Sequence, residues 1–283
     1  MSMHQRPPLA DYASWLELTW AGDTRELRHG RYLHQQADLA KQFTDSEFWR
    51  RLKHDLSAWG DDYRAKTGFA LFSSGEAPYD LDLKSWDSFI IRTWRHNIRD
   101  NSRYPEPPEQ GWLLPDNWFE NLWDIVRTRF VVRYLDGVEY LGGRLHELAT
   151  ELGLGARLEI KANDRGYYAV HVVVPQLFTV QSLNYDEMDT RRSEIELQVT
   201  TQLQEVIGQL THHHFERQRE SLDVSRESWQ WQWRNPEFTP FYLGHIIHYI
   251  EGSIMVLRSA ADDPADSGPD PAAGTSIGGA TDV

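Results

Sequence analysis

The sequence contains no cysteine among its 283 residues. The absence of thiols excludes disulfides, thiolate zinc sites and cysteine nucleophiles, and it fits a cytosolic protein. Long hydrophobic runs are also missing, because the most apolar late segment, FYLGHIIHYIEGSIMVL at 241–257, holds two histidines and a glutamate and is too short and too polar to span a bilayer. The first residues, MSMHQRPPLADYASW, lack the apolar stretch of a signal peptide. We therefore expect a soluble, cytoplasmic protein without a membrane partner.

Positive charge is scarce in this chain. There are 29 lysines and arginines against 43 aspartates and glutamates, which gives a formal net charge of −14. This balance argues against general binding of duplex nucleic acid, which needs a cationic face, but it leaves room for a local basic pocket that holds phosphate groups. Aromatic residues, in contrast, make up 12% of the chain and include 12 tryptophans, enough for a substantial core. The length suits one large domain.

Hydrophobic periodicity divides the chain into helices, then strands, then helices again. Apolar residues at spacings of three, four and seven predict a helix over 44–68, which Thr44 or Asp45 would cap and Gly68 would end. Further helices are predicted over 84–98, 137–153, 201–221 and 240–260, and strands within 124–135, 156–161, 167–174, 177–183 and 193–200. This order predicts an α+β fold with a mixed, mostly antiparallel five-stranded sheet flanked by helices.

Composition and periodicity together predict four segments. Residues 1–43 form an N-terminal helical extension, and residues 44–222 form a central domain. Residues 223–260 form a C-terminal helical extension packed on that domain. Residues 261–283 are rich in glycine, proline, alanine and aspartate and have no apolar periodicity, which predicts a disordered tail. The tryptophan-rich start of the C-terminal extension, WQWQW at 229–233, is open to several interpretations: a lid, an oligomer contact, an antitoxin-binding surface or simply core.

The stretch RGYYAVHVVV at 165–174 has the composition of a strand but carries polar aromatic residues. Side chains alternate across a strand, so Tyr167, Ala169 and His171 point to one face, and Tyr168, Val170, Val172 and Val174 point to the other. A strand that buries its valines would therefore present a tyrosine and a histidine on its opposite face.

The stretch SEIELQVTT at 193–201 alternates strictly and places Glu194, Glu196 and Gln198 on one face. Taken alone, this pattern indicates an antiparallel strand with one face in water. Carboxylates on a sheet face also hold Mg²⁺, which takes one or two carboxylates together with substrate phosphates. Asp124, at the start of DIVRTRFVV, is the candidate for a second carboxylate; its alternative role is that of a turn residue between a helix and a strand.

Three of these stretches occur in an order that resembles the synthetase domain of the RelA/SpoT alarmone enzymes. DIVRTRFVV resembles the family's Asp-x-x-Gly-x-Arg strand, GYYAVHVVV its Gly-Tyr-x-Ser-Leu-His strand, and EIELQVTT its Glu-Ile-Gln-Ile-Arg-Thr strand. The resemblance covers about residues 60–220 and implies a nucleotidyltransferase-like synthetase domain without a hydrolase. The synthetase-only members are the small alarmone synthetases and the toxic small alarmone synthetases.

The resemblance implies pyrophosphate transfer, in which ATP gives its β- and γ-phosphates to a 3′-hydroxyl and leaves as AMP. Asp124 and Glu196 would hold Mg²⁺ and act as the catalytic carboxylates, and Gln198 would support Glu196. Such transfer relies mainly on positioning and on stabilisation of phosphate charge. Glu196 is also the best-placed general base for the attacking hydroxyl.

The resemblance also implies residues that bind the two substrates. Tyr167, beside Gly166, would stack on the acceptor guanine, and His171 would hold the acceptor phosphates or the reacting hydroxyl. The other residues implied to bind substrate are Arg129 in the phosphate region, His212 on the following helix, and Lys84, Ser88, Arg92 and Arg95, which match the spacing of the family's ATP-binding element.

Several positions depart from the family pattern. Arg127 stands for the glycine of the first motif, Ala169 for the serine of the second, Thr200 for the arginine of the third, and in the ATP-binding element Asp82 stands for an arginine and Arg92 for a lysine. The changes at positions 82 and 200 remove positive charge from a site that would hold triphosphates.

Three arginines of the first strand would restore this charge: Arg127, Arg129 and Arg133. Alternation places them together, but on the strand face opposite Asp124. A β-bulge, or a position of Asp124 just before the strand, would resolve this conflict. Arg64 and Lys66 are further candidates for phosphate binding, with the exposed end of a helix as their alternative.

The resemblance thus predicts a GTP diphosphokinase-like enzyme, an ATP:nucleotide pyrophosphotransferase that acts on GDP or GTP. The acidic charge favours a nucleotide over tRNA, because a tRNA acceptor needs basic surface around the site. Two alternatives stay open: a toxic synthetase that modifies the tRNA 3′ end or adenine nucleotides, and a degenerate nucleotide-binding module without activity. An antitoxin partner and a homo-oligomer also stay open.

Overall fold

The structure is a computed structural model that describes residues 5–20, 29–73, 80–181, 188–219 and 229–262. Its α-helices are α1 (Tyr12–Thr19), α2 (His29–Thr44), α3 (Glu47–Thr67), α4 (Trp86–Trp94), α5 (Trp118–Asn121), α6 (Leu135–Glu151), α7 (Gln202–Arg219) and α8 (Phe238–Asp262). Its strands are β1 (Leu81–Leu83), β2 (Val126–Val132), β3 (Arg157–Ala162), β4 (Tyr168–Gln181) and β5 (Met188–Thr201). The end of the tail, 263–283, lies outside the described residues, and none of the helices within them is long and apolar enough to cross a membrane.

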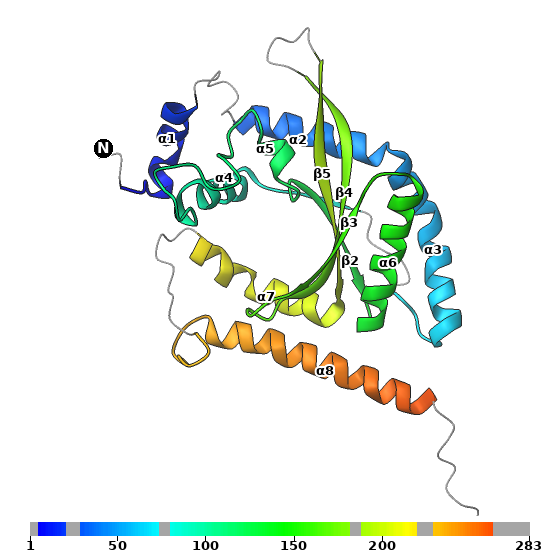
Figure 1. The fold of residues 1–283 in the computed structure, drawn as a ribbon. Coiled ribbons are helices and arrows are strands. Elements are labelled where there is room, and N and C mark those ends of the chain that lie inside the picture. Colours follow the sequence, from blue (N-terminus) through cyan, green and yellow to red (C-terminus); the bar gives the residue numbers. More distant parts are fainter. Residues whose placement is uncertain (1–4, 21–28, 74–79, 182–187, 220–228, 263–283) are drawn as a thin grey trace, which may run out of the picture.

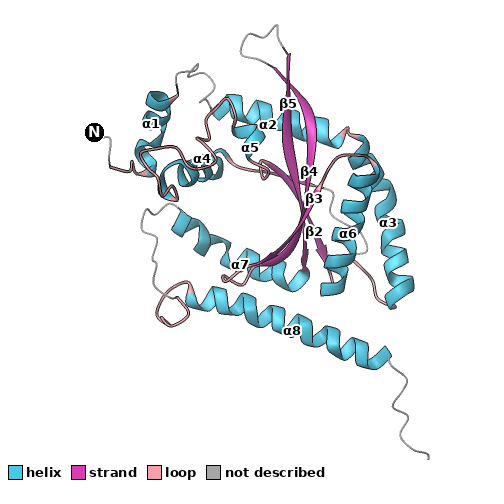
Figure 2. Cartoon of the chain, in the orientation of Figure 1, coloured by secondary structure: helices cyan, strands magenta, loops and turns pink. Residues whose placement is uncertain are grey.

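The five strands form one mixed sheet in the order β1-β2-β5-β4-β3. Figure 2 shows the long strands in the middle of the molecule with helices around them. Only β2 and β5 run parallel, and the other neighbouring strands are antiparallel. This arrangement confirms the predicted α+β fold and the mixed, mostly antiparallel sheet of five strands.

The identity of two strands differs from the prediction. The predicted strands 167–174 and 177–183 are one strand, β4, which runs through Pro175. β3 pairs with β4 only as far as Val173, so at Pro175 the strand has β5 on one side and a free edge on the other. A free edge is where proline is tolerated in a sheet. The fifth strand is β1, which is too short for periodicity to detect and exists through its pairing with β2.

One face of the sheet packs against helices and forms the core. The buried positions of β2 alternate with half-buried ones along the whole strand, as expected for a strand with one apolar face. Helix α6 packs on this face, and α3 packs on α6, so both helices lie on the same side of the sheet (Figure 1). The core residues on the three central strands are Val126, Phe130, Val132, Val170, Val172, Val174, Phe178, Ile195, Leu197 and Val199.

The ends of two helices differ in detail from the prediction. Helix α3 ends at Gly68, which has a φ of 76°, as predicted, but its N-cap is Ser46 rather than Thr44 or Asp45. The Ser46 hydroxyl accepts a hydrogen bond from the Trp49 amide at 3.2 Å. The helix predicted over 84–98 begins only after the N-cap Ser85, and its last turn is a π-helix over Arg95–Arg99. Lys84 therefore lies in the connection between β1 and α4.

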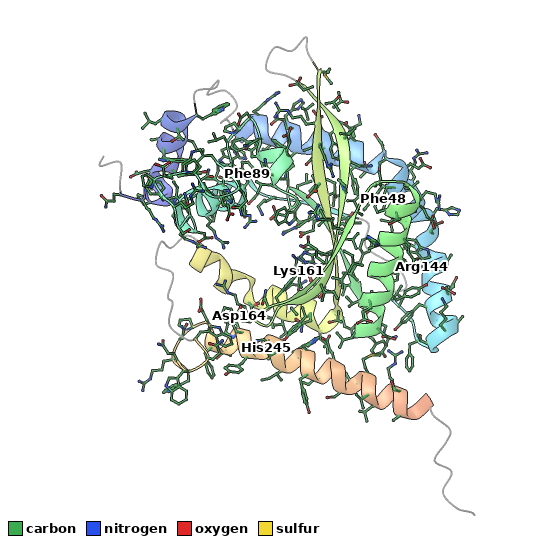
Figure 3. All side chains as sticks on the ribbon, in the orientation of Figure 1. Phe48, Phe89, Arg144, Lys161, Asp164 and His245 are labelled. Carbon is green, nitrogen blue, oxygen red and sulfur yellow. The ribbon has the colours of Figure 1, made fainter. Side chains whose placement is uncertain are left out.

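The N-terminal helices pack against the rest of the chain. Helix α2 contributes Tyr32, Leu39 and Phe43 to the main hydrophobic cluster, alongside Phe48 of α3 (Figure 3). Helix α1 forms a second cluster with Trp94 and the π-helical turn. The division of the chain into segments at residues 43 and 222 stays a prediction.

Helix α8 runs along α7 and α6 and is fixed at both ends. Near its start, the Tyr168 hydroxyl lies 2.7 Å from Nδ1 of His245, and the His245 ring reaches the Asp164 carbonyl oxygen at 3.1 Å (Figure 3). Near its end, Arg258 forms an ion pair with Asp136 at 3.1 Å. Helix α8 is thus bound at one end to the turn before β4 and to the first residue of β4, and at the other end to the start of α6.

A close backbone contact joins α8 to the turn before β4. Gly166 has a φ of 75°, and a Cβ on Gly244 would lie 3.0 Å from the Gly166 Cα and closer still to its carbonyl. Such overlap with backbone cannot relax by a rotamer change. Only glycine therefore fits at the two positions.

Gly244→Ala should therefore lower the free energy of unfolding by about 1–3 kcal/mol, the usual cost of overpacking. Gly252→Ala is the matched control on the same helix, because nothing lies within 4 Å of a Cβ at that position. It should raise stability by about 0.5–1 kcal/mol through helix propensity. Urea denaturation followed by circular dichroism measures both; equal effects of the two substitutions would contradict the close contact.

Candidate active site

The second face of the sheet carries polar side chains on neighbouring strands. Strand pairing places Arg127 of β2 opposite Glu196 of β5, and Gln198 of β5 between Arg129 of β2 and His171 of β4. Cross-strand partners share a face, so these side chains lie together. We call this surface the polar face and define it by Asp82, Arg127, Arg129, Glu159, Lys161, His171, Glu196 and Gln198. Helix α7 borders it, and Figure 3 shows Lys161 on this side of the sheet and Arg144 on the α3 side.

A series of polar contacts runs across the polar face from β4 to β2. The Tyr167 hydroxyl lies 2.9 Å from Nε2 of His171, and Nδ1 of His171 lies 2.7 Å from Oε1 of Glu196, at an angle poor for a hydrogen bond. Gln198 donates to Oε2 of Glu196 at 2.6 Å. The Gln198 carbonyl in turn accepts two hydrogen bonds from Arg129, at 3.1 and 3.2 Å. Oε2 of Glu196 is thus held by a hydrogen bond from Gln198, and Oε1 lies against the His171 ring.

Glu196 and His171 are buried side by side at the centre of the polar face. Glu196 is only 3% exposed and His171 7%. A carboxylate on one side of the ring and a phenol on the other suit the tautomer with its proton on Nδ1 and with Nε2 as the acceptor.

Tyr167 combines an enclosed hydroxyl with an accessible ring. Burial, and next the charge of Glu196, raise the pKa of Tyr167 to about 12, so the hydroxyl stays protonated at neutral pH. The residue as a whole is nevertheless 38% exposed. The ring is therefore available for stacking while the hydroxyl is committed to His171.

The two arginines of β2 that face this surface are both paired with acids. Arg127 contacts the Asp82 carboxylate at 2.5 and 2.6 Å, and Arg129 pairs with Glu205 of α7 at 2.8 Å. Two departures from the family pattern, Arg127 and Asp82, are therefore partners in one ion pair. The arginines line a cavity of about 240 Å³ together with Asp80, Asp82, Thr128, Val131, Gln198 and Glu205.

Asp124 lies two residues before the start of β2 and forms an ion pair with Lys84. Its place before the strand removes the predicted conflict with the arginines of β2. The Lys84 ammonium is 2.5 Å from Oδ2 of Asp124, and the two side chains are 9% and 24% exposed. Arg92 lies nearby, 5.8 Å from the centre of the Trp123 ring. The pair joins the connection between β1 and α4 to the segment just before β2.

The charges of this pair depend on each other. Burial lowers the pKa of Lys84, and the charge of Asp124 opposes that fall. For Asp124, burial works to raise the pKa, but Lys84, helped by Arg92 and Arg127, outweighs burial and lowers it. The carboxylate therefore stays ionised across the neutral range.

Three predicted residues lie away from the polar face. Gly166 packs on α8, and Arg64 and Lys66 lie on α3, on the far side of the sheet, where Lys66 pairs with Asp62 at 2.9 Å. The other predicted positions are Ser88, half-buried on α4 with its hydroxyl 3.0 Å from that of Ser85; Arg95, 3.4 Å from Asp100; Arg133, whose guanidinium lies 5.6 Å from the Tyr134 ring; and His212, in α7, whose side chain is outside the described part. The substrate-binding roles of all these residues stay predictions.

Sequence reasoning missed three side chains around the site. Glu205 lies on α7 beside Arg129, and Tyr32 and Gln36 of α2 reach the backbone next to Asp124. Glu205 gives no local signal, because a glutamate in a polar helical stretch is read as a surface residue, and only the fold shows that its side chain is 18% exposed beside Arg129. Gln36 gives one, because it falls on the buried stripe of α2 among apolar residues.

Asp124 and Glu196 supply as many carboxylates as a magnesium ion usually takes from a protein. No group of three or more histidine, aspartate or glutamate side chains in the described ranges could hold a metal. Mg²⁺ needs fewer, since phosphates and water complete its coordination. Asp124 and Glu196 are suitable oxygen donors, and both are partly or fully buried.

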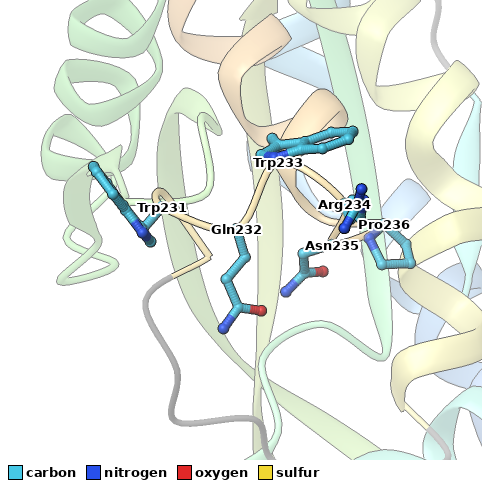
Figure 4. Close-up of a pocket in the computed structure, with 6 residues that line it drawn as sticks. All are labelled: Trp231, Gln232, Trp233, Arg234, Asn235 and Pro236. Carbon is cyan, nitrogen blue, oxygen red and sulfur yellow. The ribbon is translucent and has the colours of Figure 1, made fainter.

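A second hollow lies in the loop before α8 (Figure 4). It measures about 810 Å³ and is lined by six consecutive residues, 231–236. Trp231 and Trp233 are 88% and 67% exposed, and Arg234 lies 4.4 Å from the Trp233 ring. No carboxylate or histidine lines this hollow. The candidate active site is therefore the polar face, although its cavity is the smaller one.

Comparisons with known proteins give similar structures but no sequence match. No protein-family model matches the sequence, and no curated protein matches it. The chain is similar to a GTP pyrophosphokinase family protein from Streptococcus pneumoniae (17% identity, 78% of this chain and 93% of that chain, TM-score 0.44) and to small alarmone synthetase 2 from Bacillus subtilis (14%, 79% and 97%, 0.44). It is also similar to small alarmone synthetase 1 from Bacillus subtilis bound to its product pppGpp (11%, 79% and 98%, 0.44). The function proposed below rests on the side chains of the polar face.

The buried pair Lys84–Asp124 should be strongly coupled. Lys84→Met should lower the free energy of unfolding by about 3 kcal/mol, because it leaves a buried carboxylate without its partner. The double variant Lys84→Met/Asp124→Asn should lose less than the sum of the two single losses. Urea denaturation of the four proteins measures this coupling.

The exposed pair Lys66–Asp62 is the matched control, with side chains 62% and 37% exposed. Its double-mutant cycle should show no measurable coupling, as for most surface ion pairs. Equal coupling in the two cycles would show that burial does not strengthen the Lys84–Asp124 pair.

Proposed function

We propose that the protein is a pyrophosphokinase that transfers the β,γ-pyrophosphate of ATP to the 3′-hydroxyl of GDP or GTP. The observation that carries this proposal is the linked series Tyr167–His171–Glu196–Gln198 on the polar face. It combines a ring free to stack, a held carboxylate and a histidine that orients it. A carboxylate fixed in this way is suited to take a proton from a hydroxyl.

The transfer is a displacement at phosphorus. The acceptor 3′-oxygen attacks the β-phosphorus of ATP, the bond from that phosphorus to the α,β-bridging oxygen breaks, and AMP leaves. Glu196 takes the hydroxyl proton as the oxygen–phosphorus bond forms. Lys84 and Arg92 would meet the phosphates of ATP, and Arg129 those of the acceptor.

Asp124 and Glu196 are the residues that would hold Mg²⁺. When bound, the ion neutralises phosphate charge and helps to align the reacting groups. Their donor chemistry suits this ion, as carboxylate oxygens are its preferred protein ligands. Phosphate groups would also compete with Asp82 and Glu205 for the two arginines of the cavity.

A second acceptor class remains an alternative on the same site. Arg127 and Arg129 are neutralised by Asp82 and Glu205, which weakens the attraction of the cavity for a triphosphate. An acceptor without that charge, such as the 3′ end of tRNA, would need those arginines less. An adenine nucleotide, or nucleotide binding without transfer, is a further alternative.

The proposed activity predicts transfer of label from γ-³²P-ATP. With Mg²⁺ present, GDP and GTP should become labelled, while deacylated tRNA should not, and ATP offered alone should give no labelled pyrophosphorylated product. Glu196→Ala and Asp124→Asn should each lower the rate roughly hundredfold or more, because each removes charge stabilisation and metal placement. Thin-layer chromatography and gel electrophoresis separate the products.

Glu194→Gln is the matched control for Glu196. It lies two residues away on β5 and is held by Arg157 at 2.6 and 2.9 Å. Its rate should stay near that of the unchanged protein. Label on tRNA would keep the chemistry and replace the acceptor, while label on no acceptor would leave only a nucleotide-binding module.

Two substitutions at Tyr167 separate the ring from the hydroxyl. Tyr167→Ala should raise KM for the acceptor about tenfold to a hundredfold, since stacking on a base contributes about 1–3 kcal/mol. Tyr167→Phe keeps the ring and loses only the contact with His171, so it should lower kcat and leave KM nearly unchanged. Initial rates over a range of GDP concentrations measure both constants. A Phe variant with the same rise in KM as the Ala variant would contradict stacking.

A further inference from the structure

We infer that Tyr32 and Gln36 of helix α2 are positioning residues for the Lys84–Asp124 pair. This inference rests on the proposed function, because it concerns the ATP end of the same site. It adds to that site a helix that lies outside the stretch with sequence resemblance, about 60–220. Neither side chain is proposed to touch substrate.

The two side chains bind the backbone on both sides of the ion pair. Nε2 of Gln36 donates to the carbonyl of Lys84 at 2.8 Å and to that of Ile125 at 3.0 Å. The Tyr32 hydroxyl donates to the carbonyl of Lys84 at 2.7 Å. One amide group thus joins the residue that carries the ammonium to the neighbour of Asp124.

These contacts lie where the sheet stops holding the two segments together. The last paired residues of β1 and β2 are Leu83 and Val126. Beyond them, a single backbone hydrogen bond links Lys84 to Ile125, at 3.0 Å. Without α2, one bond would fix the separation of the segments that present Lys84 and Asp124. Gln36 adds one side-chain hydrogen bond to each of the two segments, just beyond the last paired residues of β1 and β2.

Burial makes the arrangement rigid. Tyr32 is fully buried and Gln36 is 2% exposed. The Tyr32 ring is held by Phe89, with ring centres 4.3 Å apart, and by Trp86 at 5.4 Å. A buried polar network whose members all have partners specifies one geometry, because every alternative leaves a polar group unpaired. Burial first, and then the charge of Asp124, raise the pKa of Tyr32, so its hydroxyl remains a donor.

The network also allows each side chain to be removed without leaving a carbonyl unpaired. In Gln36→Leu, the Lys84 carbonyl keeps Tyr32, and the Ile125 carbonyl keeps the Lys84 amide. In Tyr32→Phe, the Lys84 carbonyl keeps Gln36. Only the double variant leaves the Lys84 carbonyl without either donor. The single variants should therefore fold and report on positioning.

A second tyrosine–amide pair provides a matched control away from the polar face. Asn97 donates to the Tyr12 hydroxyl and to the Leu113 carbonyl, both at 2.8 Å. Tyr12 and Asn97 are fully buried. Tyr12 belongs to the cluster that α1 forms with Trp94 and Ile98, and Asn97 lies on the π-helical turn. These two side chains bind each other and the Leu113 backbone rather than Lys84 or Asp124.

The experiment measures kcat, KM for ATP and the melting temperature of six proteins in the label-transfer assay. They are the unchanged chain, Tyr32→Phe, Gln36→Leu, their double variant, Tyr12→Phe and Asn97→Leu. Gln36→Leu and Tyr32→Phe should each lower kcat about tenfold, the usual loss when a partner behind a functional group is removed. The double variant should lose more than the product of the single losses. Calorimetric titration with a non-hydrolysable ATP analogue should show weaker binding in the double variant.

The controls decide between positioning and stability. Tyr12→Phe and Asn97→Leu should lower the melting temperature as much as the α2 variants while kcat per folded molecule stays unchanged. If the α2 variants also keep kcat and analogue binding, Tyr32 and Gln36 only stabilise the fold and the inference is wrong. If the unchanged chain transfers no label at all, the proposed function fails instead, and analogue binding alone tests the positioning.

Discussion

A shift of β5 by one residue against its neighbours would turn Glu196 and Gln198 into the apolar core and bring Leu197 to the polar face. The register with β2 and β4 prevents this, because the buried faces of all three strands must align. The same pairing sets the order in which the polar groups contact one another, from His171 through Gln198 to Arg129. The core thus determines the site: the burial of valines and leucines on one side positions the carboxylate on the other.

The polar face keeps its charges in local pairs within a strongly acidic chain. Arg127 is bound by Asp82 and Arg129 by Glu205. An approaching polyphosphate would have to replace these carboxylates as the partner of the arginines, and the exposed side chain of Asp82 makes its pair the easier to open. A divalent cation between the phosphates and the carboxylates would reduce the resulting repulsion. A ligand can therefore bind these arginines only if it replaces Asp82 or Glu205 as their partner.

The elements that follow from local patterns were predictable, and those that depend on distant contacts were not. Alternation was sufficient to place Tyr167, His171 and Glu196 on one sheet face. It could not show that β4 continues through Pro175, because that depends on where β3 stops, nor that a three-residue segment pairs as β1. The position of Asp124 before β2 was one of two alternatives, and only the pairing of the strand ends distinguishes them.

Both ends of the candidate site are fixed by helices that carry no family motif. At one end, α8 packs against Gly166 and binds Tyr168. The backbone of Tyr167, the residue between them, is therefore fixed, and its side chain contacts His171. At the other end, α2 binds the backbone beside Asp124. Motifs indicate which side chains contact a ligand. The distance between the two ends of the candidate site, however, is set by the packing of helices that lie outside the motifs. A chain can therefore keep the motif residues in order and still depend, for their geometry, on segments that no motif reveals.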